Sequence, residues 1–380
     1  MDTYDVCIIG AGVVGCALAR ELGLRYGARP IRIVVLEQHG SPGEETSGRN
    51  SGVLHSGIHE HPRSLKGRLA REGSALAISY ALQHGIPLLK TGMVIAVSWD
   101  DVRRGLWRDV TMLQRLWVNA WKTNTRVFFV TPSGLRAWEP NLTSCCGIVI
   151  PSVCVIDSVA LVGSLRADAE ASGTRFAFNN RVTRIDEDAG TYMVTTNRNV
   201  IRASCLINAA GLFADDVASL ALGNNKYAIR PLRGEYYEVV APEKKRLIGR
   251  LVYPALPSRA TGKGIHLSPR PNGQLFIGPN EMVVRDKTDY TSHKNPPGIF
   301  IEAVHKFFPT LEERDLCWAY SGIRPCVLTG DRRRNDFIVS VDRDHPPLIN
   351  LIGIDSPGLS AALALARHVV DLPCLQNLVR

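Results

Sequence analysis

The sequence lacks long hydrophobic runs, internal repeats and metal-binding patterns, and each absence narrows the function. No apolar run reaches the roughly 18 residues that a membrane-spanning helix requires, so we expect no transmembrane segment. A first strand predicted from Tyr4 leaves no space before it for a cleaved targeting presequence. The nine cysteines show no metal-ligand or redox spacing. We therefore expect no metal site, and the reduced thiols of an intracellular protein.

The charge of the chain is positive but does not indicate a nucleic-acid partner. The formal net charge is +9. The densest basic cluster, Arg332–Arg334, has no aromatic residues between its arginines, so we predict no nucleic-acid binding. Two interpretations stay open: a soluble surface rich in arginine, or a cationic funnel that attracts an anionic substrate. Because 380 residues exceed the usual size of one hydrophobic core, we expect two domains.

What is present begins with the pattern of a dinucleotide-binding βαβ unit. An apolar strand is predicted over Tyr4–Ile9, followed by Gly-Ala-Gly-Val-Val-Gly at Gly10–Gly15. A helix rich in Ala and Leu extends to about Tyr26, and a second strand over Ile31–Leu36 ends on Glu37. Since both strands, the helix and the acidic residue occur at the right spacing, the pattern predicts a dinucleotide cofactor.

Each residue of this pattern has a physical role in holding the cofactor. Gly10 permits the tight turn, Gly12 lets the backbone approach a pyrophosphate, and Gly15 lets the helix pack closely on the strand. The pyrophosphate would lie on N–H groups at the start of the helix, around Val14, where the helix dipole favours negative charge. Glu37 can accept hydrogen bonds from a ribose diol, and its charge argues against the 2′-phosphate of NADP.

The rest of the chain alternates strands and helices at both ends around a strand-rich middle. Periodicity predicts helices at about 64–84, 102–121, 157–172 and 357–370, and one that begins near 213. Strands are predicted at 88–97, 126–130, 175–178, 182–185, 201–207, 230–240, 264–267, 274–277 and 348–352. The pattern predicts an α/β (α+β) protein whose nucleotide-binding domain is discontinuous in the sequence.

Three motifs together resemble one enzyme family. They are NSGVLHSG at Asn50–Gly57, LRGEYYEV at Leu232–Val239 and GIDSPGLS at Gly353–Ser360. With them the chain resembles the FAD-dependent oxidoreductases of the D-amino-acid oxidase and glycerol-3-phosphate dehydrogenase superfamily, and most of all its L-2-hydroxyglutarate dehydrogenase and oxidase branch. The resemblance covers nearly the whole chain, although residues 100–131 match it less well.

The resemblance implies a particular division of the chain. A Rossmann-like FAD-binding domain of the glutathione-reductase type would be built from residues 1–85, 151–222 and 326–380. A substrate domain on an antiparallel or mixed β-sheet would be built from residues 86–150 and 223–325. We expect a small-molecule site where the two domains meet.

The resemblance also implies FAD and the residues that hold it. The helix after Gly353–Leu359 would direct its N-terminus at the flavin, where its dipole would stabilise negative charge on the reduced ring. An ordinary strand-to-helix turn is the alternative interpretation of this motif. The expected cofactor residues are Gly10, Gly12, Val14, Gly15, Glu37, Ser47, Arg49, Asn50, Ser51, Val182, Ala210, Gly211, Ser356, Gly358 and Leu359.

His55 is the first candidate for catalysis. Oxidation of a secondary alcohol requires a base to take the hydroxyl proton, and a histidine with an unperturbed pKa of about 6.5 suits this near neutral pH. The alternative is a hydrogen-bonded histidine that shapes the flavin pocket. Some superfamily members attach FAD covalently through a histidine in this region, so that link also stays open.

Arg324, in the segment Gly-Ile-Arg-Pro, is the first candidate for substrate binding. A guanidinium grips a carboxylate with two parallel hydrogen bonds. A hydroxy diacid needs a second cation, because a buried carboxylate without a partner costs several kcal/mol. Arg233, with a phenol from Tyr237 or its neighbour Tyr236, is one candidate, and His266 is another; Arg63 and Lys66 are weaker ones. His266 and Arg324 are also candidates for catalysis, beside His55. Each of these could instead be structural.

The predicted activity is FAD-dependent oxidation of a 2-hydroxy acid, with L-2-hydroxyglutarate converted to 2-oxoglutarate by hydride transfer to the flavin. A glycerol-3-phosphate dehydrogenase and an amino-acid oxidase are alternatives on the same fold. An NAD-dependent dehydrogenase and a non-enzymatic nucleotide- or nucleic-acid-binding protein are alternatives from other classes. Electrons would pass to an acceptor such as a quinone or oxygen. The resemblance leaves open a cytoplasmic or mitochondrial location and peripheral association with a membrane.

Overall fold

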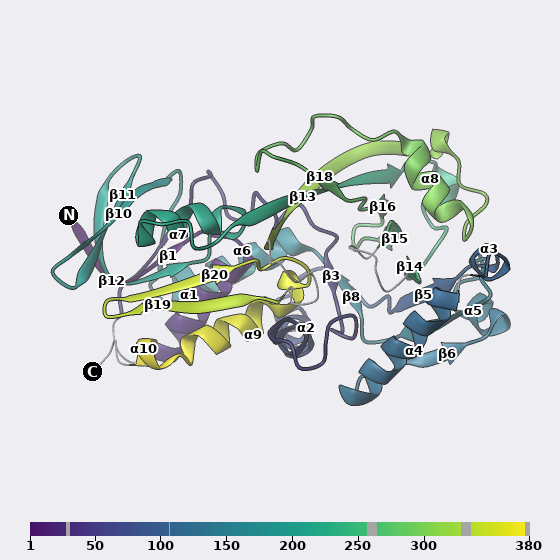
Figure 1. Cartoon of the computed structure of the whole chain (residues 1–380), viewed down its shortest axis with the longest axis horizontal. Helices are drawn as coiled ribbons and strands as arrows, with labels where there is room; N and C mark the ends of the chain where they lie inside the picture. The colour runs from purple at the N-terminus through teal and green to yellow at the C-terminus, as the bar shows by residue number, and fades with distance from the viewer. Residues whose placement is uncertain (28–30, 106, 257–263, 328–335, 377–380) are drawn as a thin grey trace.

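The computed structural model describes residues 1–27, 31–105, 107–256, 264–327 and 336–376. The Arg332–Arg334 cluster lies outside them. Figure 1 shows two groups of elements side by side, each built around a β-sheet, with β13 (Ile229–Val239) and β18 (Leu316–Val327) extending between them. The fold is mixed α/β, as the sequence predicts. In the part of the chain that the structure describes, no helix is both long and apolar enough to cross a membrane.

The first sheet has eight strands among the described residues, and its centre is parallel. The parallel order is β9-β2-β1-β12-β20, in which β12 pairs with β1 along its length. The other edge of β12 is divided: its first residues pair with β11, and Leu206–Asn208 pair with β20. The strands are β1 (Asp2–Ile9), β2 (Ile33–Leu36), β9 (Arg175–Ala177), β10 (Val182–Asp188), β11 (Thr191–Thr196), β12 (Val200–Asn208), β19 (Ile338–Asp344) and β20 (Pro347–Ile352).

The carboxyl ends of β1 and β12 form the switch point of this sheet. From β1 the chain turns through α1 (Val13–Tyr26) to β2 on one side, whereas β12 lies on the other side. Open α/β sheets bind ligands at such a point. The turn after β1 requires glycine, because Gly10 has φ 104° and a Cβ there would lie 2.6 Å from the carbonyl oxygen of Ala209. The predicted βαβ unit is therefore present.

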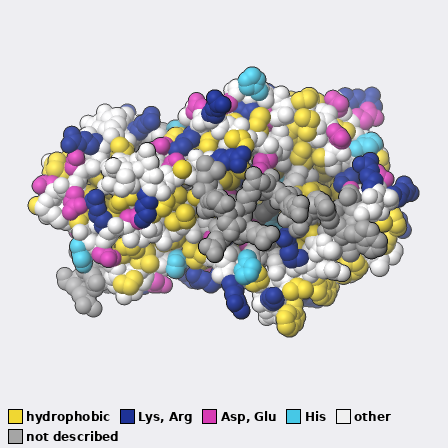
Figure 2. All heavy atoms as spheres, viewed as in Figure 1, with side chains coloured by type: hydrophobic (Ala, Val, Ile, Leu, Met, Phe, Trp, Pro, Cys, Tyr) yellow, Lys and Arg dark blue, Asp and Glu magenta, His cyan; other side chains and the backbone are white. Residues whose placement is uncertain are grey.

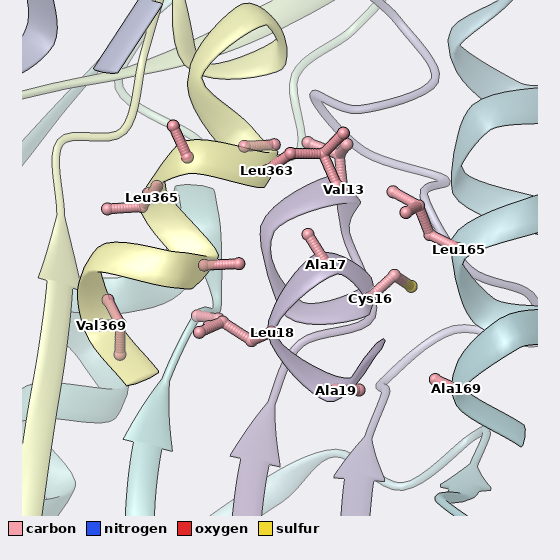
Figure 3. Packing of buried hydrophobic residues seen from close by; sticks show 14 of the residues in the cluster. Val13, Cys16, Ala17, Leu18, Ala19, Leu165, Ala169, Leu363, Leu365 and Val369 are labelled. Atoms are coloured by element: carbon pink, nitrogen blue, oxygen red, sulfur yellow. The ribbon is translucent and has the colours of Figure 1, made fainter. Parts of the chain in front are cut away.

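Four helices cover one face of this sheet: α1, α2 (Leu65–Gln83), α6 (Ser158–Ala171) and α9 (Gly358–Val370). Figure 3 shows α1 between α9 and α6, with Leu18 directed toward α9 and Cys16 toward α6. Small residues let these helices approach one another: a Cβ at Gly73 of α2 would lie 2.3 Å from the carbonyl oxygen of Ser360. On the opposite face, α7 (Ala214–Leu222) and buried side chains of β10 and β11 form one cluster with side chains of β1 and β2.

The second sheet has nine strands among the described residues and is largely antiparallel. Its order is β17-β13-β16-β15-β14-β5-β7-β6, and β18 pairs with the other edge of β13. The strands not yet given are β5 (Met93–Val97), β6 (Phe128–Val130), β7 (Cys146–Ile150), β14 (Leu251–Pro254), β15 (His266–Pro269), β16 (Leu275–Gly278) and β17 (Met282–Val283). A small sheet of β3 (Val53–Leu54), β8 (Cys154–Ile156) and β4 (Leu88–Leu89) shares buried clusters with both large sheets.

The remaining helices lie mainly beside the second sheet (Figure 1). They are α3 (Trp99–Arg103), α4 (Trp107–Lys122), α5 (Pro132–Trp138), α8 (Pro297–His305) and α10 (Pro373–Gln376), with 3₁₀ turns η1 (Gly211–Phe213), η2 (Pro242–Lys244) and η3 (Glu313–Asp315). The single helix predicted over 102–121 is thus two helices, and Gly105 between them has φ 69°. The strand β18 was not predicted. The domain boundaries stay a prediction, although the strands of the first sheet come from three separate segments of the chain.

Candidate functional site

Two adjoining cavities lie along the carboxyl ends of β1 and β12. The first, of about 450 Å³, extends between the two sheets, and the second, of about 630 Å³, extends along the first sheet toward β2. Five residues line both cavities: Gly12, Thr46, Ser47, Ala209 and Gly211. The two cavities therefore form one elongated track, as an extended dinucleotide would require.

The second cavity is lined by Glu37, the acidic residue at the end of the βαβ unit. The Glu37 carboxylate accepts hydrogen bonds from the backbone N–H groups of Ala11 (2.8 Å) and His39 (2.9 Å), which hold it in place in the cavity wall. A carboxylate held in this way has further lone pairs that can accept from a ribose diol. Val182, Ala210 and Gly211 also line this cavity. The resemblance implies a backbone contact to adenine for Val182, and a turn beside the diphosphate for Ala210 and Gly211.

The N-terminus of α1 lies at the junction of the two cavities. Gly12 precedes the helix and lines both, and Val14 lines the first cavity. The backbone N–H of Val13 donates to Ser47 Oγ at 2.9 Å, which joins the helix start to the loop that follows β2. A Cβ at Gly12 would lie 3.0 Å from the same oxygen. Gly15 instead packs inward, where a Cβ would lie 1.9 Å from the carbonyl oxygen of Gly10.

The loop before β3 forms one wall of the first cavity, to which Ser47, Arg49, Asn50 and Ser51 all contribute. Asn50 holds this loop together: its side-chain amide donates to the carbonyl oxygens of Thr46 and Ser47, and its Oδ1 accepts from the N–H of Gly52 at 2.7 Å. Two of the predicted cofactor residues, Asn50 and Ser47, are thus engaged in shaping the wall.

The N-terminus of α9 forms the opposite wall, where Ser356, Gly358 and Leu359 line the first cavity. Asp355, just before this turn, is paired with Lys66 of α2 at 2.5 Å (Nζ–Oδ1). Burial acts to lower the pKa of Lys66, but the charges of Asp355 and Glu60 and the hydrogen bond to Asp355 outweigh burial and raise it. Two helix N-termini, α1 and α9, therefore face one track, so its electrostatic environment suits the anionic groups of a flavin dinucleotide.

His55 and His266 both contact the ring of one tyrosine, Tyr253. The His266 ring stacks on Tyr253 of β14, with ring centroids 3.7 Å apart and planes 17° apart, and His55 meets the same ring edge-on at 6.3 Å. All three residues are buried and line the first cavity. The backbone N–H of His55 donates to Ser360 Oγ of α9 at 2.8 Å. Burial raises the pKa of Tyr253, so its phenol stays protonated near neutral pH.

Arg324, the first candidate for substrate binding, reaches the first cavity from β18. Its Nη2 donates to Glu281 Oε2 at 2.8 Å, and both side chains keep about a quarter of their surface exposed, 23% and 25%. Glu281 lines the same cavity. A guanidinium has five N–H donors in a planar fork, so the pair with Glu281 leaves donors for a second anion.

Arg233 and Tyr237 are not among the described residues that line the cavity. Side chains alternate along a strand, and Gly234 and Tyr236 face the cavity, so Arg233 and Tyr237 point to the other face of β13. Arg233 is 1% exposed; it donates to Asp289 Oδ1 at 2.9 Å and to the carbonyl oxygens of residues 292 and 293. Tyr237 donates to the carbonyl oxygen of Asn295 at 2.7 Å.

The two weaker candidates are also not among the described residues that line the cavity. Arg63 is exposed and is not among the described lining residues, and Lys66 is committed to Asp355. Sequence reasoning missed Tyr253 and Glu281, which line the first cavity. Tyr253 lies in a short apolar strand that looks like ordinary core. Glu281 follows Gly278–Asn280, and only that break at the end of a strand could have drawn attention to it.

The comparisons with known proteins agree with this geometry. A sequence model of the family described as FAD dependent oxidoreductase (DAO) matches residues 5–372. The chain is 27% identical to a glycerol 3-phosphate dehydrogenase of Caloramator mitchellensis, over 99% of this chain and 75% of the relative. It is also 27% identical to the mitochondrial L-2-hydroxyglutarate dehydrogenase of Nematostella vectensis, over 97% of this chain and 90% of the relative.

A solved structure has the same fold over nearly its whole length. It is the dithionite-reduced L-alpha-glycerophosphate oxidase of Mycoplasma pneumoniae with FAD bound. The TM-score is 0.87 at 27% sequence identity, and the match covers 99% of this chain and 95% of that one.

Proposed function

Because this chain belongs to the FAD-dependent oxidoreductase (DAO) family, we propose that its first cavity oxidises the CH–OH group of a small anionic hydroxy compound, most of all L-2-hydroxyglutarate. The observation that carries this proposal is the presence of Arg324, His55 and His266 around one cavity that continues into the dinucleotide track. An anion holder, candidate bases and a cofactor site thus converge on one small volume. FAD, when bound, supplies the hydride acceptor.

The residues of the chain divide the remaining work. Arg324 would hold the anionic group of the substrate and so fix the orientation of its hydroxyl-bearing carbon. His55 or His266 would take the hydroxyl proton, and Tyr253, packed against both rings, would hold them in position. The start of α9 would stabilise negative charge that develops on the cofactor. The alternative for His55, a histidine that only shapes the pocket, predicts a different mutant phenotype, argued below.

Glycerol 3-phosphate is a second candidate, and one observation favours it. The predicted second cation for a diacid, Arg233, is held by Asp289 outside the cavity. Among the described lining residues, the arginines are Arg49 and Arg324. A substrate with a single anionic group would therefore be served more simply than a diacid. The similarity to the glycerophosphate oxidase of Mycoplasma pneumoniae supports glycerol 3-phosphate, just as the similarity to the L-2-hydroxyglutarate dehydrogenase supports the diacid.

One experiment separates these candidates. The purified, FAD-loaded protein is mixed without oxygen with each enantiomer of 2-hydroxyglutarate, with glycerol 3-phosphate and with amino acids, while the flavin absorbance is recorded. We expect bleaching by L-2-hydroxyglutarate. Bleaching by glycerol 3-phosphate alone would select the second candidate. A protein that holds FAD but is bleached by none of these compounds would contradict both.

Electrons would pass to an acceptor such as a quinone or oxygen. Separately, the exposed surface of α4 supports docking of the protein at an anionic membrane. Trp117 and Trp121, four residues apart on α4, are 46% and 79% exposed, and Arg115 and Lys122 beside them are exposed too. Figure 2 shows hydrophobic side chains at the lower edge of the molecule with basic ones beside them, where α4 ends in Figure 1. Sedimentation with phosphatidylglycerol vesicles should carry the protein down, and Trp117→Ser with Trp121→Ser should abolish it.

A further inference from the structure

The anion-binding arginine of the first cavity is already paired with a carboxylate of the chain itself. Arg324 Nη2 lies 2.8 Å from Glu281 Oε2. The other carboxylate that lines this cavity, Asp355, is paired with Lys66. Both carboxylates in the described cavity wall are therefore paired with a cation before any substrate enters.

The second arginine that lines the cavity is also engaged. Arg49 Nε donates to the carbonyl oxygen of Glu44 at 3.1 Å, and its guanidinium lies over the ring of Tyr290, 4.5 Å from the centroid. Neither contact neutralises its charge, but both hold it against the wall. Of the two arginines in the described cavity wall, Arg324 is thus the one that forms an ion pair with a lining carboxylate.

The sheet fixes this pair from both sides. Arg324 on β18 pairs with Leu232 of β13, while β17, which directly follows Glu281, pairs with the opposite edge of β13 through Met282 and Arg233. The two side chains therefore meet above β13.

The segment that carries Glu281 is itself held close to β13. A Cβ at Gly234 would lie 2.6 Å from Pro279 Cβ, and the Oδ1 of Asn280 accepts from the backbone N–H of Glu235 at 2.8 Å. Since Gly234 has no side chain, Pro279 and Asn280 can lie directly on the strand. The backbone of Glu281 is thus fixed, and only its side chain can move away from Arg324.

We propose that Glu281 is a specificity-determining residue, an internal carboxylate that competes with the anionic group of the substrate for Arg324. The inference rests on the proposed function only in taking Arg324 as the residue that holds this group. An incoming anion must either displace Glu281 or share the guanidinium with it. In both cases the negative charge of Glu281 opposes binding, because like charges a few ångströms apart repel each other in a partly buried site.

This competition discriminates between substrates by their charge. Coulomb repulsion scales with the product of the charges, so Glu281 opposes a dianion more strongly than a monoanion. Glu281 therefore favours a group with one negative charge, such as a carboxylate, over one with two, such as a phosphate. An enzyme of this fold without the competing carboxylate would bind both more tightly, with the larger gain for the dianion.

The test compares the wild-type holoenzyme with Glu281→Gln. Acetate and sulfate, which carry one and two charges, are titrated into each protein while the flavin absorbance is followed. We expect Glu281→Gln to bind acetate roughly tenfold more tightly, and sulfate more tightly by a clearly larger factor. With a turned-over substrate, its KM should fall while kcat moves far less. Equal or weaker anion binding in Glu281→Gln, or no binding to either protein, would overturn the proposal.

Two further variants separate competition from other causes. Glu243→Gln removes the same charge from an exposed position and should leave both affinities as in the wild type. Combining Glu281→Gln with Arg324→Gln should abolish the gain, because Glu281 acts through Arg324. A gain that persists without Arg324 would contradict the mechanism. Because the titrations need no turnover, they give a result even if neither hydroxy compound proves to be the substrate.

Discussion

The side-chain ammonium of Lys66 lies 2.5 Å from the carboxylate of Asp355, and the two side chains are 4% and 8% exposed. The pair joins the first turn of α2 to the turn that precedes α9. The Cys326 thiol also donates to Asp355, at 3.4 Å to Oδ2. Because Asp355 lines the first cavity, this buried pair fixes the wall from which α9 directs its N-terminus at the track.

Lys66→Met should destabilise the protein strongly. It leaves the Asp355 carboxylate buried without its cation, which costs about 3–5 kcal/mol in the free energy of unfolding. Urea unfolding of the holoenzyme measures this, and FAD content should fall as well. Lys90→Met, at an exposed position, is the control. Adding Asp355→Asn to Lys66→Met should restore part of the stability; a loss below about 1 kcal/mol in the single variant would contradict the account.

The same pair predicts a loss of stability at alkaline pH. The pKa of Lys66 is raised in the folded protein, above its ordinary value of about 10.4. Its contribution is therefore fully present below that value and is lost as the pH rises through the folded pKa. The difference in unfolding free energy between wild type and Lys66→Met should be constant near neutral pH and shrink above pH ~10.4. A difference that grows in this range would have the wrong sign.

Gly12→Val should yield protein without FAD. The φ of Gly12 is −72°, so a side chain is compatible with the backbone, but its Cβ would lie 3.0 Å from Ser47 Oγ at the junction of the two cavities. A valine would thus fill the place where the backbone must approach a pyrophosphate. Absorbance of the purified protein gives the flavin content. Gly163→Ala on α6, where a Cβ meets nothing within 4 Å, should keep full occupancy.

The cofactor half of the site could be predicted because its signal is local. Gly10, Gly12 and Glu37 are fixed by a turn, a helix and a strand that follow one another directly, so spacing alone places them on one track. The structure brings the expected loop, Ser47 to Ser51, and the expected turn before α9 to the same cavity. These two segments meet only through long-range packing, so the expectation that they share a site came from the family resemblance and not from spacing.

The substrate half was predicted less completely because strand faces and distant pairs are not encoded locally. Arg233 and Gly234 are neighbours on β13, and a shift of one residue decides which of them faces the cavity. The register of β13 also shifts between Tyr236 and Tyr237, and a prediction from the sequence that assumes regular alternation cannot anticipate this shift. Glu281 and Arg324 are 43 residues apart. They meet because β18, which carries Arg324, and β17, which directly follows Glu281, both pair with β13.

His55→Asn distinguishes a catalytic base from a histidine that shapes the pocket. If His55 takes the hydroxyl proton, kcat should fall by about 10²–10⁴-fold while FAD content and the flavin spectrum are retained. Loss of FAD with a small change in kcat per flavin would support the structural alternative. His266→Asn tests the other ring on Tyr253 in the same way, and the larger loss in kcat identifies the base. His305→Asn, exposed on α8, is the control.

Arg324→Ala should raise KM strongly and leave the flavin content intact. The guanidinium is the group in the cavity best able to form two parallel hydrogen bonds with a carboxylate, and losing such a charged contact corresponds to roughly a hundredfold or more in KM. Arg324→Lys keeps the positive charge but loses the planar fork of N–H donors, so its KM should lie between that of the wild type and that of Arg324→Ala. Arg198→Ala, exposed and absent from the described cavity wall, controls for the loss of one positive charge. An unchanged KM in Arg324→Ala would remove Arg324 from the substrate site and, with it, the role proposed for Glu281.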